Sequence, residues 1–224
     1  MTVERSIFDI LSAPLPFPSR RDAILAAASL VFVRHGYEGA SMELVAQGAG
    51  VARRTLYNQF PDGKKALFLA VVERMWQSFP VMDISTDAAA LADPEVGLRR
   101  IGYGIAAFWN PPLAVAFLRM VIGEASRFPE LMQSFFEIGK TPAVTAVTSY
   151  IAELGSRGVL DVPDAGLASR HFLGLVDETM LWVRVMGDER APTQESIEET
   201  VEQAVIIFLG HYRVRRSGTR RKSA

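Results

Sequence analysis

Apolar residues recur at helical spacing along most of the chain, and glycine and proline interrupt the recurrence at intervals. Ser19 followed by Asp22 is a capping-box signature, and apolar positions three and four residues apart then continue to Gly36. No segment alternates apolar and polar residues strictly between hairpin turns, so no sheet is expected. The pattern therefore predicts an all-α fold.

Two short helices follow the first one, and longer helices come after them. Ser41 is a candidate N-cap of a segment that closes at Gly50, and a second short helix covers 52–60. A turn with proline and glycine separates it from a long helix expected over 64–79. Further helices are predicted over 95–109, 113–126, 130–154, 164–186 and 194–213.

The two short helices, joined at Gly50 with a longer helix in front, have the proportions of a helix-turn-helix. An advance of about 100° per residue places Ala52, Leu56 and Phe60 in one apolar stripe. The opposite side carries guanidinium, hydroxyl and amide groups, which suit phosphates and base edges. A solvated helix face or a structural corner would have the same spacing, so these alternatives stay open at this point.

The division of charge along the chain places a polyanionic partner at its first third. Residues 1–72 contain eight Lys or Arg against six Asp or Glu, and four of those cations accompany one anion within 51–65. Residues 73–212 contain ten cations against nineteen anions, and 213–224 contain six cations and no anion. A polyanion would therefore meet the first third, and the acidic middle has a different role.

Composition and spacing exclude several kinds of site. The chain has no cysteine, and His35, His171 and His211 stand on separate predicted helices, so no metal site or other cofactor is expected. The uncharged run over 101–118 is near the minimum length of a membrane span, but Asn110-Pro111-Pro112 interrupts it. We expect two helices that meet at a turn there, no membrane contact and a cytoplasmic protein.

The residues over 36–60, GYEGASMELVAQGAGVARRTLYNQF, closely resemble the DNA-binding domain of the TetR/AcrR family of transcriptional repressors. The resemblance extends over about 19–68. Farther along, FLRMVIGEASRFPEL at 117–131 and FLGL at 172–175 resemble the C-terminal domains of the AefR-like subgroup of that family. The resemblance implies a DNA-binding function for the first helices.

Positions that match the family motif imply particular contacts to DNA. Tyr57, Gln59 and Lys64 match positions that contact phosphate. Ser41 matches the residue that caps the second helix and reaches phosphate through its hydroxyl or its backbone N–H. The positions that face the major groove in the family are matched here by Arg53, Arg54, Thr55 and Asn58.

The motif departs from the family pattern at three places. Ala52 stands where Ser or Thr usually caps the recognition helix, a loss of about 1 kcal/mol. Leu44 stands where an acid would close a capping box on Ser41. The turn before Lys64 is one residue longer than usual, so Lys65 competes with Lys64 for the phosphate position.

The acidic, aromatic remainder indicates a small-molecule cavity and a dimer. Helical bundles rich in methionine and aromatic residues are where such cavities occur, and the resemblance implies an effector pocket among the central helices. The last two long helices carry more apolar surface than one protomer covers, which favours a two-fold four-helix interface. The expected pocket lining is Trp76, Tyr103, Phe117, Met120, Phe136, Asp177 and Met180.

The sequence thus predicts a homodimeric, ligand-responsive transcriptional repressor that binds a palindromic operator in double-stranded DNA and is released by a small, largely apolar effector. No catalytic motif is complete, so we do not expect an enzyme. An all-helical enzyme or a protein-interaction module that reuses the fold are the alternatives. The predicted parts are an N-terminal arm (1–18), a DNA-binding domain (19–68), an effector-binding and dimerisation domain (69–212) and a basic tail (213–224).

Overall fold

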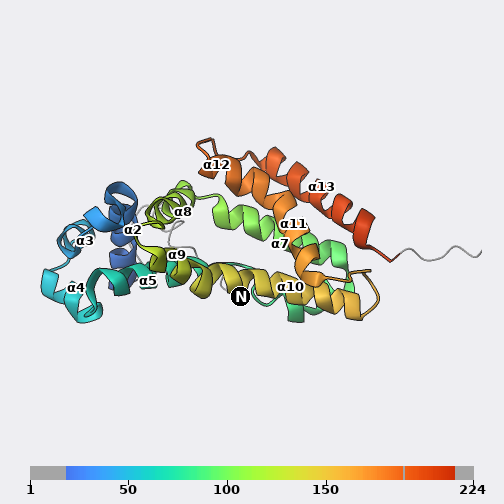
Figure 1. Cartoon of the computed structure of the whole chain (residues 1–224), viewed down its shortest axis with the longest axis horizontal. Coiled ribbons are helices and arrows are strands. Elements are labelled where there is room, and N and C mark those ends of the chain that lie inside the picture. The colour runs from blue at the N-terminus through green and yellow to red at the C-terminus, as the bar shows by residue number, and fades with distance from the viewer. Residues whose placement is uncertain (1–18, 189, 215–224) are drawn as a thin grey trace, which may run out of the picture.

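The computed structural model describes residues 19–188 and 190–214, and these fold into helices (Figure 1). Within the described ranges the only extended pairing is one isolated β-bridge. The prediction of an all-α fold is therefore confirmed. The expected N-terminal arm, 1–18, lies outside the described residues, as does most of the expected basic tail.

Three helices gather at one end of the elongated molecule (Figure 1). Ser19 Oγ accepts the N–H of Asp22 at 3.0 Å, which confirms the predicted cap of the first helix. Gly36 has a φ of 69°, so the regular helix breaks there, although helical turns continue to Gly39. Gly50, with a φ of 63°, closes the second helix in the left-handed conformation. The helices are α2 (Arg20–Gly39), α3 (Met42–Ala49) and α4 (Arg53–Gln59).

Helix α5 (Gly63–Trp76) leads from this end into the other half of the molecule (Figure 1). It ends at Trp76, three residues before the predicted end, and Phe79 follows as a buried residue of the next turn. Two short helices then cover a segment where none was predicted, because three and five residues are too few to show a helical period. They are η1 (Ile84–Thr86) and α6 (Ala88–Ala92).

The predicted turn at 110–112 separates two helices that are bent by 78° relative to each other. The buried Arg184 guanidinium holds this corner by donating to the carbonyl oxygens of Trp109 at 2.5 Å and Asn110 at 3.1 Å. Among the described residues, no individual helix is both long enough and apolar enough to cross a membrane, and only this bent pair meets those criteria together. The two helices are α7 (Pro94–Trp109) and α8 (Pro112–Glu124).

Two of the long predicted helices each contain a π-helical turn. The helices predicted over 130–154 and 164–186 are present, but each is interrupted by five residues with wider turns. A π turn shifts the register of the side chains that follow it, and the apolar period does not reveal this. The segments are α9 (Pro129–Phe135), η2 (Phe136–Lys140) and α10 (Thr141–Ser156), then α11 (Ala165–Asp177), η3 (Glu178–Trp182), α12 (Val183–Val185) and finally α13 (Gln194–Tyr212).

The core continues from the first three helices into the rest of the chain. Phe68 of α5 lies 5.7 Å from Phe32 of α2 and 5.7 Å from Phe117 of α8, measured between ring centroids. Tyr37 contacts Phe68 and also Phe128, whose ring centroid is 5.1 Å away. Aromatic contacts of this kind favour one relative placement of the rings. The helix-turn-helix is therefore held against α8 and α9 by a fixed aromatic cluster.

The break in α2 gives a test of this arrangement. Replacing Gly36 with alanine should lower the free energy of unfolding by about 2 kcal/mol, because φ is positive there. The added Cβ would also lie 2.5 Å from Oε1 of Glu124. Urea unfolding followed by circular dichroism measures the change.

Gly123→Ala is the matched control on α8, since open space surrounds that glycine within the helix. It should raise the free energy of unfolding by a few tenths of a kcal/mol, up to about 1 kcal/mol. Equal effects of the two substitutions would show that Gly36 has no special role.

Candidate functional site

The outer face of α4 is polar and exposed, and its inner face is apolar and buried. Leu56 is fully buried and Phe60 is 3% exposed, so these two members of the predicted apolar stripe are confirmed. Ala52 is exposed, contrary to the prediction, because it is the N-cap and precedes the first helical turn. The exposed side chains on the opposite face are Arg53, Arg54, Tyr57 and Asn58.

Two of the expected DNA-contacting side chains are turned partly inward. Thr55 is half-buried. Gln59 is also half-buried, and its Oε1 atom is enclosed without a hydrogen-bond partner. Arg53 stays at the surface, where its Nη1 lies 3.5 Å from Oε1 of Glu43 on α3. This exposed ion pair spans the two helices of the turn.

Ser41 caps α3 as predicted, since its Oγ accepts the N–H of Leu44 at 3.2 Å. Ala52 makes no side-chain cap on α4, which agrees with the predicted missing cap. The Ser41 oxygen accepts this bond, so its O–H hydrogen can still donate to an anion together with the neighbouring backbone N–H groups.

Lys64 points into the protein. Its Nζ donates to the carbonyl oxygens of Tyr37 at 2.7 Å and Glu38 at 3.0 Å, and it lies 4.6 Å from the centroid of the Tyr37 ring. With the turn one residue longer than usual, α5 begins at Gly63, and Lys64 stands in its first turn beside the end of α2. Lys65, the competitor, is exposed to solvent.

The segment that Lys64 holds is also held from α8 and the turn that follows it. The backbone N–H of Tyr37 donates to Oε1 of Glu124 at 3.0 Å, and Glu38 pairs with Arg127. Burial raises the pKa of the Tyr37 hydroxyl, and the negative charge of Glu130 raises it further. The end of α2 is therefore fixed between α5 and the turn from α8 to α9.

A small cavity lies between α5, α7, α10 and α11. Its volume of about 20 Å³ is enough for one water molecule. A Cβ at Gly139 of η2 would lie 2.0 Å from Cδ1 of Trp76, so η2 reaches α5 only because this residue is glycine. The lining residues are Trp76, Phe79, Ile105, Trp109, Lys140, Ala143, Val144, Leu173 and Asp177.

An ion pair stands in this apolar cavity. Nζ of Lys140, the last residue of η2, lies 3.5 Å from Oδ2 of Asp177, the last residue of α11. Burial raises the pKa of Asp177, and the nearby charge of Lys140 opposes that shift. Nε1 of Trp76 is buried with no hydrogen-bond partner.

The structure brings together only part of the predicted pocket. Trp76 and Asp177 line the cavity. Tyr103 lies beside Glu202 of α13, and Phe117 stacks on Phe68 at the junction with the DNA-binding end. The remaining three do not line it: Phe136 is 47% exposed, Met120 is half-buried on α8, and Met180 is buried within η3.

The sequence analysis did not identify most of the residues that line this cavity, including the cation Lys140. Lys140 is the only Lys or Arg between Arg127 and Arg157, and a lone cation in an apolar helical pattern was the available signal. Phe79 lies beyond the end of α5, where the helical period gives no guidance. The other missed residues are Ile105, Trp109, Ala143, Val144 and Leu173.

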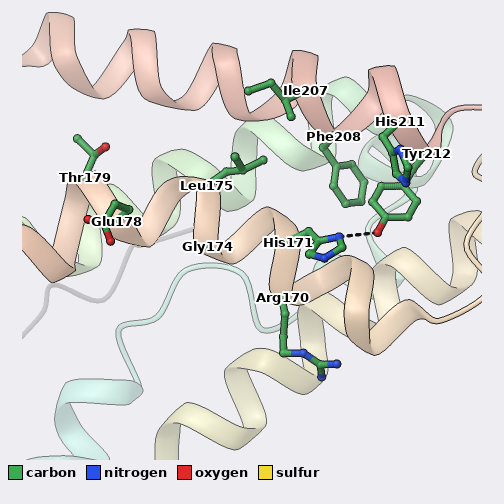
Figure 2. A pocket seen from close by; sticks show the side chains of 10 residues that line it. All are labelled: Arg170, His171, Gly174, Leu175, Glu178, Thr179, Ile207, Phe208, His211 and Tyr212. Carbon is green, nitrogen blue, oxygen red and sulfur yellow. Dashed lines mark hydrogen bonds between the residues drawn. The ribbon is translucent and has the colours of Figure 1, made fainter.

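A wider open groove of about 800 Å³ runs along α11 and α13. Figure 2 shows Leu175 and Ile207 beside the space between these helices, with the hydrogen bond between His171 and Tyr212 at one end. Ile206 and Ile207 are 60% and 52% exposed, which is unusual for such apolar side chains. The lining residues are Arg170, His171, Gly174, Leu175, Glu178, Thr179, Ile207, Phe208, His211 and Tyr212.

Two parts of the chain match known protein families. Residues 24–71 match the bacterial regulatory proteins of the tetR family. Residues 96–214, more than half of the chain, match the C-terminal domain of AefR-like transcriptional repressors. The chain belongs to the TetR family. Helices α3 and α4 are thus the helix-turn-helix of a TetR-family transcriptional regulator, as predicted.

Relatives and solved structures agree with this assignment. FasR, a transcriptional activator of Mycolicibacterium smegmatis, is 47% identical over 60 residues, which are 27% of this chain and 27% of FasR. KstR, a transcriptional repressor of the same species, is 33% identical over 129 residues, which are 52% of this chain and 61% of KstR. The chain therefore spans less than two thirds of the length of either relative.

The matched structures cover more of the chain. A TetR-family regulator from Mesorhizobium loti has a TM-score of 0.74 at 26% identity, over 87% of this chain and 97% of that one. The flavonoid-responsive regulator FrrA has a TM-score of 0.67 at 28% identity, over 88% of this chain and 98% of that one.

The ion pair of half-buried Lys140 with buried Asp177 yields a prediction about stability. Lys140→Gln should lower the free energy of unfolding by about 3 kcal/mol at about pH 8, because Asp177 would stay buried without its cation. A raised pKa in the folded state means that stability falls as pH rises through that pKa, so the loss should shrink at about pH 5. Urea unfolding at both pH values measures it.

The double variant Lys140→Gln with Asp177→Asn should recover most of the loss, since no buried charge remains. If the double variant is as unstable as the single one, the destabilisation comes from lost packing and the ion pair is not its cause.

Proposed function

We propose that this chain is a ligand-responsive transcriptional repressor, which binds a palindromic operator as a homodimer and is released by a small, largely apolar effector. The observation that carries the proposal is the two-sided character of α4. Its polar face is exposed, and Leu56 and Phe60 anchor the other face in the core. An anchored helix with outward guanidinium and amide groups is the arrangement that reads a major groove.

The proposed contacts divide into two kinds. Arg53, Arg54, Thr55 and Asn58 would face base edges, and Thr55 would need a small outward rotation because it is half-buried. The side chain of Tyr57, 44% exposed, would contact phosphate together with Lys65, and Lys65 takes the place first expected for Lys64. Ser41 and Gln59 would contribute at the edge of the site.

The groove along α11 and α13 supports the homodimer. A second copy could place the same apolar surface over the exposed Ile206 and Ile207, and the two pairs of helices would form a four-helix interface. Such a dimer binds DNA when its two α4 helices stand about 34–36 Å apart, one helical turn of DNA.

The position of α5 supports a mechanism of release. Its first turn carries Lys64, which holds the end of α2, and its last residue, Trp76, lines the cavity. An effector larger than one water molecule must separate Trp76 from η2, and this displaces α5. The displacement of α5 then changes the distance between the two α4 helices of the dimer. A nearly complete switch requires that the effector prefer the non-binding form by about 5 kcal/mol.

Selection of binding sites from random duplex DNA tests the proposal, and it should return a palindrome.

Two variants test the proposed contacts. Lys65→Gln should weaken binding to all sequences and reduce the salt dependence of affinity by about one counterion per protomer. Asn58→Ala should change the preferred bases and leave the salt dependence unchanged. Fluorescence anisotropy at several salt concentrations measures both.

Arg157→Gln is the control, because Arg157 is a surface cation that pairs with Glu153 on α10, away from α4. It should leave affinity and salt dependence unchanged. Unchanged DNA binding in the Lys65 and Asn58 variants would contradict the assignment of the α4 face.

Dimerisation has its own test. Ile207→Asp should shift the protein from dimer to monomer in sedimentation velocity, because a carboxylate would be buried in the interface. Met82→Asp is the matched control, since Met82 is similarly exposed at 47% and lies outside the groove. A dimer that survives Ile207→Asp would place the interface elsewhere.

A further inference from the structure

Trp76, which lines the cavity between α5, α7, α10 and α11, has an N–H donor with no acceptor. Nε1 of Trp76 is buried, and the structure gives it no hydrogen-bond partner. The rest of the indole is also enclosed, with 6% of the residue exposed. A buried N–H without an acceptor costs free energy, so a ligand with an acceptor atom gains by reaching it.

The cation in the cavity has hydrogen-bonding capacity left over. Nζ of Lys140 lies 3.5 Å from Oδ2 of Asp177, longer than the roughly 2.7–2.9 Å of a strong charge-assisted hydrogen bond. An ammonium group carries three N–H donors. Lys140 can therefore donate to an incoming anion that approaches more closely than Asp177 does.

The carboxylate of Asp177 is the other charged group among the described lining residues. The lining that comes from α5, α7 and α10 is apolar or aromatic, as is Leu173 of α11. Burial disfavours the charge of Asp177, and Lys140 is the charged group that sustains it. If Lys140 finds another anion, Asp177 can take up a proton and stay buried as a neutral acid.

We propose that the effector is an apolar molecule with one carboxylate group, which accepts hydrogen bonds from Nζ of Lys140 and Nε1 of Trp76. The ligand carboxylate replaces Asp177 as the counterion of Lys140, and Asp177 binds one proton from the solvent. The net charge of the site stays at zero. The inference rests on the proposed function, because it specifies the effector of the same cavity.

A cationic ligand fits the same residues less well. An amine would meet the positive charge of Lys140, and it would leave Nε1 of Trp76 without an acceptor. A neutral alcohol could accept a hydrogen bond from Trp76 or Lys140, but it brings no negative charge to pair with the ammonium. The three head groups therefore give different affinities on the same apolar body.

The test uses matched sets of probes on three bodies: naphthoate, phenylbutyrate and octanoate, each with its corresponding primary alcohol and primary amine. Isothermal titration calorimetry on the full chain at about pH 7 should show at least one carboxylate binding about tenfold or more tightly than its alcohol. Failure of every carboxylate to bind, or an equal or greater affinity for an alcohol or amine, would overturn the inference.

Variants then assign the preference to the two charged residues. Lys140→Gln should remove the advantage of the carboxylate over the alcohol, and Arg157→Gln, outside the cavity, should keep it. In the wild type, affinity for the carboxylate should weaken with rising pH by up to about tenfold per unit where Asp177 is ionised. The Asp177→Asn variant should bind the carboxylate with no such dependence of affinity on pH. A wild-type affinity that does not change with pH would contradict proton uptake by Asp177.

Operator binding without probe separates this inference from the proposed function. If the wild type binds a palindromic DNA site but shows no preference for carboxylates, the inference fails and the proposed function stands. If the chain binds no DNA, the proposed function fails whatever the probes do.

Discussion

The end of α2 is held from two sides, and the orientation of the helix-turn-helix depends on that clamp. Lys64 of α5 binds the carbonyl oxygens of Tyr37 and Glu38, and Glu124 of α8 accepts the N–H of Tyr37. Each of these three bonds involves a backbone atom of Tyr37 or Glu38. The bonds therefore hold the main chain in place and do not depend on which side chains these two residues carry. They also require the left-handed glycine at position 36, because a Cβ would fill the place of the Glu124 carboxylate.

The same helix that makes this clamp also closes the cavity. Because α5 is continuous from Gly63 to Trp76, a displacement at one end is passed to the other. An ion pair that buries a carboxylate, such as Asp177 with half-buried Lys140, adds little stability over an apolar pair of the same volume. Both members stand at the edge of a π-helical turn, and such turns are frequent at functional sites. These features support a binding role for the pair.

The sequence allowed the fold and the outer face of α4 to be predicted, because both depend on local periodicity. Leu56 and Phe60 are buried where the helical stripe required it. The orientation of Lys64 depends instead on the length of one turn and on what lies opposite, the end of α2, which no local pattern encodes. The exposure of Phe136 and the partner of Phe117 likewise follow from tertiary placement.

The lining of the cavity also depends on tertiary placement, which local sequence patterns do not encode. Trp76 and Asp177 were predicted from residue type and position, but Lys140 was not, because a π turn places it opposite Asp177. Methionine and aromatic content, together with the family resemblance, predicted a pocket among the central helices. They did not indicate which rings surround it, since four helices distant in the sequence contribute the lining.

The missing side chain at position 139 makes the proposed response to an effector depend on a single glycine codon. Any larger residue there would occupy the volume of the Trp76 indole and push α5 from η2 with no effector present. Under the release mechanism proposed above, a single-base change in the glycine codon would therefore imitate the effector and lower operator affinity without altering the helix-turn-helix.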